Sequence, residues 1–294
     1  MKSTAPTLRF GVPAPFDFEA PGSWLSRLAL AQGCTLEELL EFLDLGFDGV
    51  DLDRSIHGKT LSELRRRCSL PHGAFAVAGG LMSGLRRVRL PWYALLTDSK
   101  ARPRFRYCPL CLRQRRLAHL DIHWRFADWR YCPDHNCLME DACCKCGAAV
   151  SYPCDMAKSK AGRVGSASQG KCQTCRSDLS AAVPCMINPT TSTALTELEA
   201  CWLLNGRALL ASLLKGNARY RAEGIGTAAI GQRAYFEWLP RPGVWAAVEH
   251  RVRRELLSRP MNMPEERLTL SQFRATRWGR VISVERINPL EWKA

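Results

Sequence analysis

The sequence lacks an apolar run long enough to cross a membrane. Its best candidate, Ala74–Leu85, is interrupted by three glycines and falls well short of the ~20 residues that a span needs. The first residues also lack the apolar segment of a signal peptide. We therefore expect a cytoplasmic chain without membrane contact. In that reducing compartment its 14 cysteines would serve metal binding and burial rather than disulfides.

Acidic residues are scarce, with 28 Asp and Glu against 42 Lys and Arg, so the net charge is +14. Residues 1–60 carry 5 basic and 9 acidic side chains, residues 61–194 carry 21 and 9, and residues 195–294 carry 16 and 10. A basic field of this kind attracts phosphate backbones or acidic partner surfaces, and arginine supplies most of it. The alternative interpretation is a solvated basic surface.

Enzyme signatures are also missing. A zinc deaminase combines His-x-Glu with Pro-Cys-x-x-Cys, and no His-x-Glu occurs in the chain. Asp48, Asp51 and Asp53 could hold magnesium for nuclease chemistry, but their alternation with Val50 and Leu52 favours a solvent-exposed face. We predict no catalytic residues and no enzyme activity.

The middle third contains four short Cys/His pairs, each with two residues between the ligands. Two ligands spaced in this way on a tight turn can occupy adjacent corners of a tetrahedron, and a structural zinc ion takes four corners. A lone pair could instead be a redox dithiol, but four successive pairs favour metal. Pairing them in chain order predicts two structural Zn²⁺ ions, held by Cys108, Cys111, Cys132 and His135 and by Cys143, Cys146, Cys172 and Cys175.

The ligand set of the second site stays open at this stage, because Cys144 adjoins Cys143 and could replace it, while Cys137 and Cys154 are near enough to compete. His119 and His123 could also coordinate metal. The four pairs already fill both predicted sites, however, so we interpret these histidines as structural.

Helical spacing dominates the first hundred residues. Residues 23–31 and 35–43 predict two helices around Gly33, and Thr35 with Glu38 forms a capping box for the second. The pair resembles a helix-turn-helix, but its second helix is acidic, which favours packing or a protein contact over DNA.

A further capping box, Thr60–Glu63, predicts a helix with a basic face that would meet nucleic acid more readily, although a solvated face is the alternative. Our candidate nucleic-acid contacts are Arg65, Arg66 and Arg67 on this helix and Arg113, Arg115 and Arg116 in the Arg-rich segment that follows the first Cys pair.

Residues 120–126 alternate apolar and polar side chains and predict a short strand beside the first zinc. Residues 155–170 predict a flexible loop, and residues 196–204 and 244–257 predict helices. Residues 220–231 are ambiguous, and residues 280–288 suit a short strand.

The predicted fold is mainly α with small zinc-ribbon β elements, in which helix-turn-helix-like helical units flank two zinc-binding ribbons. The predicted domains are an N-terminal helical domain at 1–100, a tandem zinc-ribbon region at 101–180 and a mainly helical basic domain at 181–294.

The spaced pairs and their neighbours resemble the TniQ/TnsD family of transposon target-selection proteins. The resemblance extends over roughly residues 10 to 180. It rests on Ser23-Trp24-Leu25-x-Arg27-Leu28-Ala29, Tyr107-Cys108-Pro-x-Cys111-Leu112, Trp124-Arg125, Trp129-Arg130-x-Cys132-Pro133-x-His135 with Leu138, and Cys143-x-x-Cys146-Gly147.

This resemblance implies a non-catalytic adaptor that recognises a target site and recruits an AAA+ ATPase regulator and, through it, a transposase. Relatives reach their targets either by binding DNA or through an RNA-guided CRISPR effector, and some form homodimers. The alternative hypothesis is a zinc-ribbon DNA-binding transcription regulator, which would share the metal and the charge but would need no ATPase.

Overall fold

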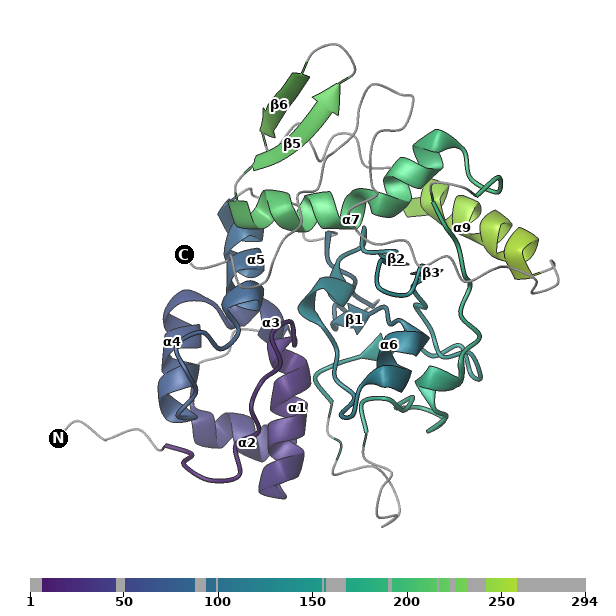
Figure 1. Ribbon diagram of the computed structural model, residues 1–294. Helices are drawn as coiled ribbons and strands as arrows, with labels where there is room; N and C mark the ends of the chain where they lie inside the picture. Colours follow the sequence, from purple (N-terminus) through teal and green to yellow (C-terminus); the bar gives the residue numbers. More distant parts are fainter. Residues whose placement is uncertain are drawn as a thin grey trace. The chain divides into compact units, whose positions relative to one another are not determined.

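Figure 1 shows a computed structural model of the chain. It describes residues 7–45, 51–87, 94–98, 100–154, 156, 168–189, 192–215, 217–222, 226–231 and 242–257. Helices dominate these residues, and their strands form small two-stranded antiparallel sheets, as the sequence predicted. The chain divides into two compact units, one of Met1–Phe126 with Glu140–Ala182 and the other of Ala127–Met139 with Val183–Ala294.

The first unit opens with α1 (Pro21–Gln32) and α2 (Leu36–Leu43). Proline in the first turn of α1 suits a position whose N–H has no helical partner. Gly33 ends α1 with a φ of 68°, and its N–H caps the last turn, which confirms the predicted break. The capping box of Thr35 and Glu38 is also confirmed, because each side chain accepts the backbone N–H of the other.

Three more helices complete this helical part: α3 (Leu52–Ser55), α4 (Gly58–Arg67) and α5 (Ala76–Arg87). The predicted capping box at Thr60 is wrong, since α4 begins two residues earlier, at Gly58, whose φ of 51° turns the chain into the helix. A Cβ on Gly79 would lie 2.7 Å from Leu61 Cδ2, so this glycine permits α5 to pack closely on α4. In the described part of the chain no helix has the length and hydropathy of a membrane span.

The ribbon part of the first unit contains β1 (Arg104–Phe105) paired with β4 (Val150–Ser151), the helix α6 (Pro109–Gln114) and two short 3₁₀ helices, η2 (Ile122–Arg125) and η3 (Leu179–Ala181). The predicted strand at residues 120–126 is wrong, because η2 occupies its centre. Both Trp124 and Arg125 are fully buried there, so the alternation of apolar and polar residues did not report one buried and one exposed face.

The second unit contains the hairpin of β2 (Tyr131–Cys132) and β3 (Cys137–Leu138), the helix α7 (Glu197–Lys215), the hairpin of β5 (Asn217–Ala222) and β6 (Gly226–Gly231), and the helix α9 (Pro242–Leu257). Figure 1 shows α7 leading into β5. The two predicted helices are confirmed, and the ambiguous residues 220–231 belong to the second hairpin. The core of the unit includes Tyr131, Leu138, Leu203, Trp245 and Val252.

Two predictions fall largely or wholly outside the described residues: the flexible loop at 155–170, of which only a few residues are described, and the strand at 280–288.

Candidate metal centres

The first predicted ligand set is brought together as the sequence proposed. One ligand atom from each of Cys108, Cys111, Cys132 and His135 lies within 4.8 Å of the others. Cys108 caps α6, and its sulfur accepts the backbone N–H of Cys111 at 3.4 Å. The helix therefore fixes the spacing of the first two ligands.

The second pair of this cluster lies on the β2–β3 hairpin. The Sγ of Cys132 lies 3.5 Å from the Nδ1 of His135, and Asn136 turns the chain with a φ of 48°. For bond lengths of ~2.3 Å to sulfur and ~2.0 Å to nitrogen, a tetrahedral zinc ion separates these two atoms by about 3.6 Å. The observed spacing fits a shared ion.

Cys143, Cys146, Cys172 and Cys175 form the second cluster. Two cross-pair distances, Cys143–Cys175 and Cys146–Cys172, are each 3.6 Å between sulfurs. A disulfide would place sulfurs about 2.05 Å apart, whereas two thiolates on one tetrahedral zinc lie about 3.8 Å apart. The geometry is that of a metal cluster rather than of two disulfides.

Both pairs of the second cluster use the same turn. Gly147 and Arg176 follow their pairs with φ of 70° and 63°, and their N–H groups donate to the carbonyls of Cys143 at 2.8 Å and Cys172 at 2.9 Å. Hydrogen bonding with Ser177 lowers the pKa of the Cys175 thiol to about 6. The thiolate form, which binds metal, is thus favoured at this corner.

The cysteines that could have competed lie outside both clusters. Cys144 is exposed while its neighbour Cys143 is buried and takes the place in the cluster. Cys137 is buried opposite Cys132 on the hairpin, and Cys154 is half-buried. Burial of Cys143 between Tyr107 and the turn at Gly147 therefore decides a question that sequence spacing left open.

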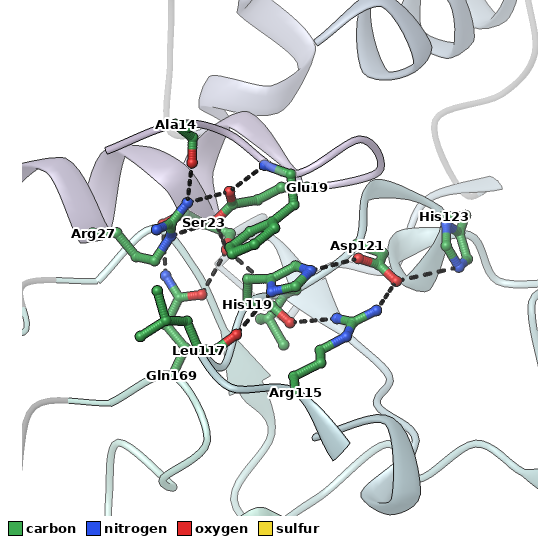
Figure 2. A network of polar contacts seen from close by, with 12 residues as sticks. Ala14, Glu19, Ser23, Arg27, Arg115, Leu117, His119, Asp121, His123 and Gln169 are labelled. Carbon is green, nitrogen blue, oxygen red and sulfur yellow. Dashed lines mark hydrogen bonds and ion pairs between the residues drawn. The ribbon is translucent and has the colours of Figure 1, made fainter. Parts of the chain in front are cut away.

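His119 and His123 belong to neither cluster. Figure 2 shows both beside Asp121, with Nε2 atoms 3.5 and 3.7 Å from its carboxylate oxygens, and Arg115 donates to the same group. The ring of His119 also stacks on Phe16 at 4.0 Å between centroids. Burial, and then the Arg115 cation, lowers the pKa of His119 to about 4, so its ring is neutral at pH 7 and serves packing.

The rest of this network fastens α1 to the ribbon. The Ser23 hydroxyl donates to Gln169 Oε1 at 2.6 Å and accepts the N–H of Leu120 at 3.1 Å (Figure 2). Glu19 is buried and accepts from Arg27 at 2.6 Å. Sequence reasoning missed Ser23, Glu19 and Gln169, because a polar residue in a helix or loop carries no local sign of a partner some 146 positions away.

The prediction that Asp51 and Asp53 occupy a solvent-exposed face is wrong. Asp53 is fully buried and Asp51 is 9% exposed, and both accept hydrogen bonds from the fully buried Arg125. A second Asp53 oxygen accepts the N–H of Gly22 at the start of α1 at 2.6 Å. Both carboxylates are already engaged with a guanidinium group, which accounts for them without magnesium. Asp48 lies outside the described residues.

Three of the arginines predicted to meet nucleic acid lie at the end of α4. Arg65 donates to the carbonyl of Ala74 at 2.8 Å, and Arg66 and Arg67 pair with Glu63 at 2.5 and 2.8 Å. Arg66 is the most exposed of the three. Their role toward nucleic acid stays a prediction.

The other three lie in α6 and just after it. Arg113 is exposed and donates to the carbonyl of Ser180 at 2.7 Å, and the half-buried Arg115 pairs with Asp121. Arg116 is exposed and makes no hydrogen bond or ion pair with a described residue. Their contact with nucleic acid likewise stays a prediction.

Residues 11–139 match the model of the TniQ family, so the chain carries a TniQ family domain over that stretch. The match includes the whole first cluster and stops before the second. TniQ family proteins are non-catalytic transposition factors, and the domain implies a role in choosing transposition targets. None of the curated proteins compared with the chain matches it.

Proposed function

We propose that this chain, with its TniQ family domain at residues 11–139, is a non-catalytic adaptor of DNA transposition that acts in the cytoplasm. It recognises or bridges to the target site, recruits an AAA+ ATPase regulator and brings in the transposase through that ATPase. The observation that carries the proposal is the family match, whose stretch contains all four residues of the first metal cluster.

We infer that both clusters bind Zn²⁺ in a structural role. Sets of three cysteines with one histidine, and of four cysteines, are the donors that tetrahedral zinc prefers. All four corners of each ion would be taken by protein atoms, which leaves no open position for a reacting water. The ions would hold the ribbon in place rather than perform chemistry.

Target DNA is the second partner in this proposal. The net charge of +14 supports it, and so do the three exposed candidate contacts, Arg66, Arg113 and Arg116. Arg67 and Arg115 would reach a phosphate only by exchanging a carboxylate partner. We therefore expect the exposed arginines to contribute most of the binding free energy.

The acidic side of α2 fits a protein partner better than DNA. Glu37, Glu38 and Glu41 are exposed on the side of the helix away from buried Leu39 and Leu43. Like-signed charge would repel a phosphate backbone and would attract a basic protein surface. We assign this surface to the ATPase contact.

Capture of the ATPase tests the function. The tagged full-length chain is mixed with an AAA+ ATPase encoded beside it, and retained ATPase is quantified. Glu37→Lys with Glu41→Lys should weaken capture, whereas Asp17→Lys with Asp141→Lys, which reverses the same number of exposed charges elsewhere, should not. A chain that binds a promoter-like site and captures no such ATPase would instead be the transcription regulator.

A further inference from the structure

The β5–β6 hairpin forms a two-stranded ribbon in a part of the chain that the family match does not reach. Its six residue pairs run from Asn217 opposite Gly231 to Ala222 opposite Gly226. α7 ends at Lys215 and β5 begins at Asn217, and the two elements contact each other, so the ribbon extends from the end of a long helix. No third strand of the described residues pairs with it.

The charges of the ribbon are all of one sign. Arg219 and Arg221 occupy alternate positions of β5, and alternate positions lie on the same face of a strand. Their register partners on β6 are Ala229 and Thr227, which are small and uncharged. Among the described residues from 206 to 231 no acidic residue occurs, and Lys215 adds a further positive charge where the helix meets the ribbon.

The dimensions of the ribbon suit duplex DNA. Six residues per strand at ~3.3 Å each give a ribbon about 20 Å long. The major groove, about 12 Å wide, admits a two-stranded ribbon of this kind. Two arginines facing small neighbours are well suited to reach phosphate oxygens without competition from a carboxylate on the same face.

We propose that the β5–β6 ribbon is a DNA-contacting arm, in which Arg219 and Arg221 bind backbone phosphates of duplex DNA. This deepens the DNA-binding part of the proposed function and rests on it. The contact fixes the orientation of the chain on the duplex and is independent of base sequence, because phosphate contacts carry no sequence information. A protein strand added to the edge of the ribbon would be the competing occupant, and the alternating arginines favour phosphate over it.

Salt-dependent DNA binding tests the proposal. The full-length chain is titrated against a fluorescein-labelled duplex of about 30 base pairs, three helical turns, at several salt concentrations. For Arg219→Ala with Arg221→Ala, the slope of log affinity against log salt should fall by about 1.8. That change corresponds to an affinity about 60-fold lower at 0.1 M salt, referred to 1 M.

Two further variants keep the result interpretable. Arg9→Ala with Lys100→Ala removes the same charge from exposed positions outside the ribbon and should leave the slope close to that of the parent chain. Thr227→Glu retains both arginines but places a carboxylate at the register position of Arg221, and it should lower the slope by about 1. Unchanged metal content and circular dichroism confirm that each variant is folded.

Several outcomes would overturn the assignment. A ribbon variant with the parental slope removes the ribbon from the DNA interface, and an equal loss in the Arg9 and Lys100 variant attributes the effect to overall charge. Ribbon variants that keep DNA binding but lose ATPase capture would make the occupant a protein. A parent chain that binds no duplex also refutes the arm, whereas ATPase capture still decides the adaptor function separately.

Discussion

Replacement of Arg125 by methionine should destabilise the first unit by about 3–5 kcal/mol, the cost of removing one partner from a buried ion pair. Arg125 is fully buried and donates to Asp51 at 2.6 and 2.7 Å and to Asp53 at 2.9 Å. Methionine preserves much of the buried volume. The loss would therefore come from two carboxylates left in a site that excludes water.

The loss should depend on pH. Burial raises the pKa of Asp53 from 3.8 to about 6, with Arg125 opposing the rise and Asp51 adding to it. A carboxyl whose pKa is higher in the folded state binds its proton more tightly there, so its contribution to stability is present at low pH and is lost as pH rises through the folded pKa. Without the Arg125 cation this pKa rises further, and the deficit should be larger at about pH 8 than at about pH 5.

Urea unfolding of Arg125→Met and of the parent chain, followed by tryptophan fluorescence at both pH values, measures the effect. Asp51→Asn with Asp53→Asn in the Arg125→Met background removes both unpaired charges and should restore part of the stability at about pH 8. A loss below about 1 kcal/mol, typical of an exposed pair, would refute the argument. So would a deficit that is the same at both pH values.

Three other predictions concern the ribbon. Elemental analysis should find two zinc ions per chain, fewer in Cys132→Ser and two in Cys144→Ser, and chelation should raise hydrogen exchange across residues 102–180 as a unit, since structural zinc contributes on the order of 10 kcal/mol; retention of both ions in Cys132→Ser would contradict the ligand set. Gly147→Ala should lower thermal stability by about 1 kcal/mol because the residue has a φ of 70°, whereas Arg176→Gly at the matching turn should not; equal effects would contradict the strain argument. Ser23→Ala should cost about 1–3 kcal/mol in urea unfolding by leaving Gln169 without its buried partner, and a neutral effect would mean that the network rearranges.

Much of the metal arrangement was predictable because it is local. Two residues between ligands fix a turn whatever surrounds it, so Cys108 with Cys111 and Cys172 with Cys175 could be recognised as pairs. The same holds for the capping box at Thr35, whose partner lies three residues away. Pairing the turns in chain order then required only that neighbouring turns share an ion.

The errors lie where distant residues decide. The spacing of Asp51 and Asp53 resembled an exposed strand face, and residues 120–126 resembled a half-buried strand, because alternation does not reveal that Arg125 and the two aspartates bury each other's charge. The choice of Cys143 over Cys144 depended in the same way on which side chain the ribbon covers.

The sequence by itself determined the ligand pairs, the helix boundaries at Gly33 and Thr35, the basic charge and the family resemblance, since each is encoded within a few neighbouring residues or in composition. Only the tertiary structure decided which cysteine completes the second cluster, that His119 packs beside Asp121, and that Arg125 holds two aspartates 72 and 74 positions away. Those contacts arise from burial, which brings together charges that no sequence spacing connects.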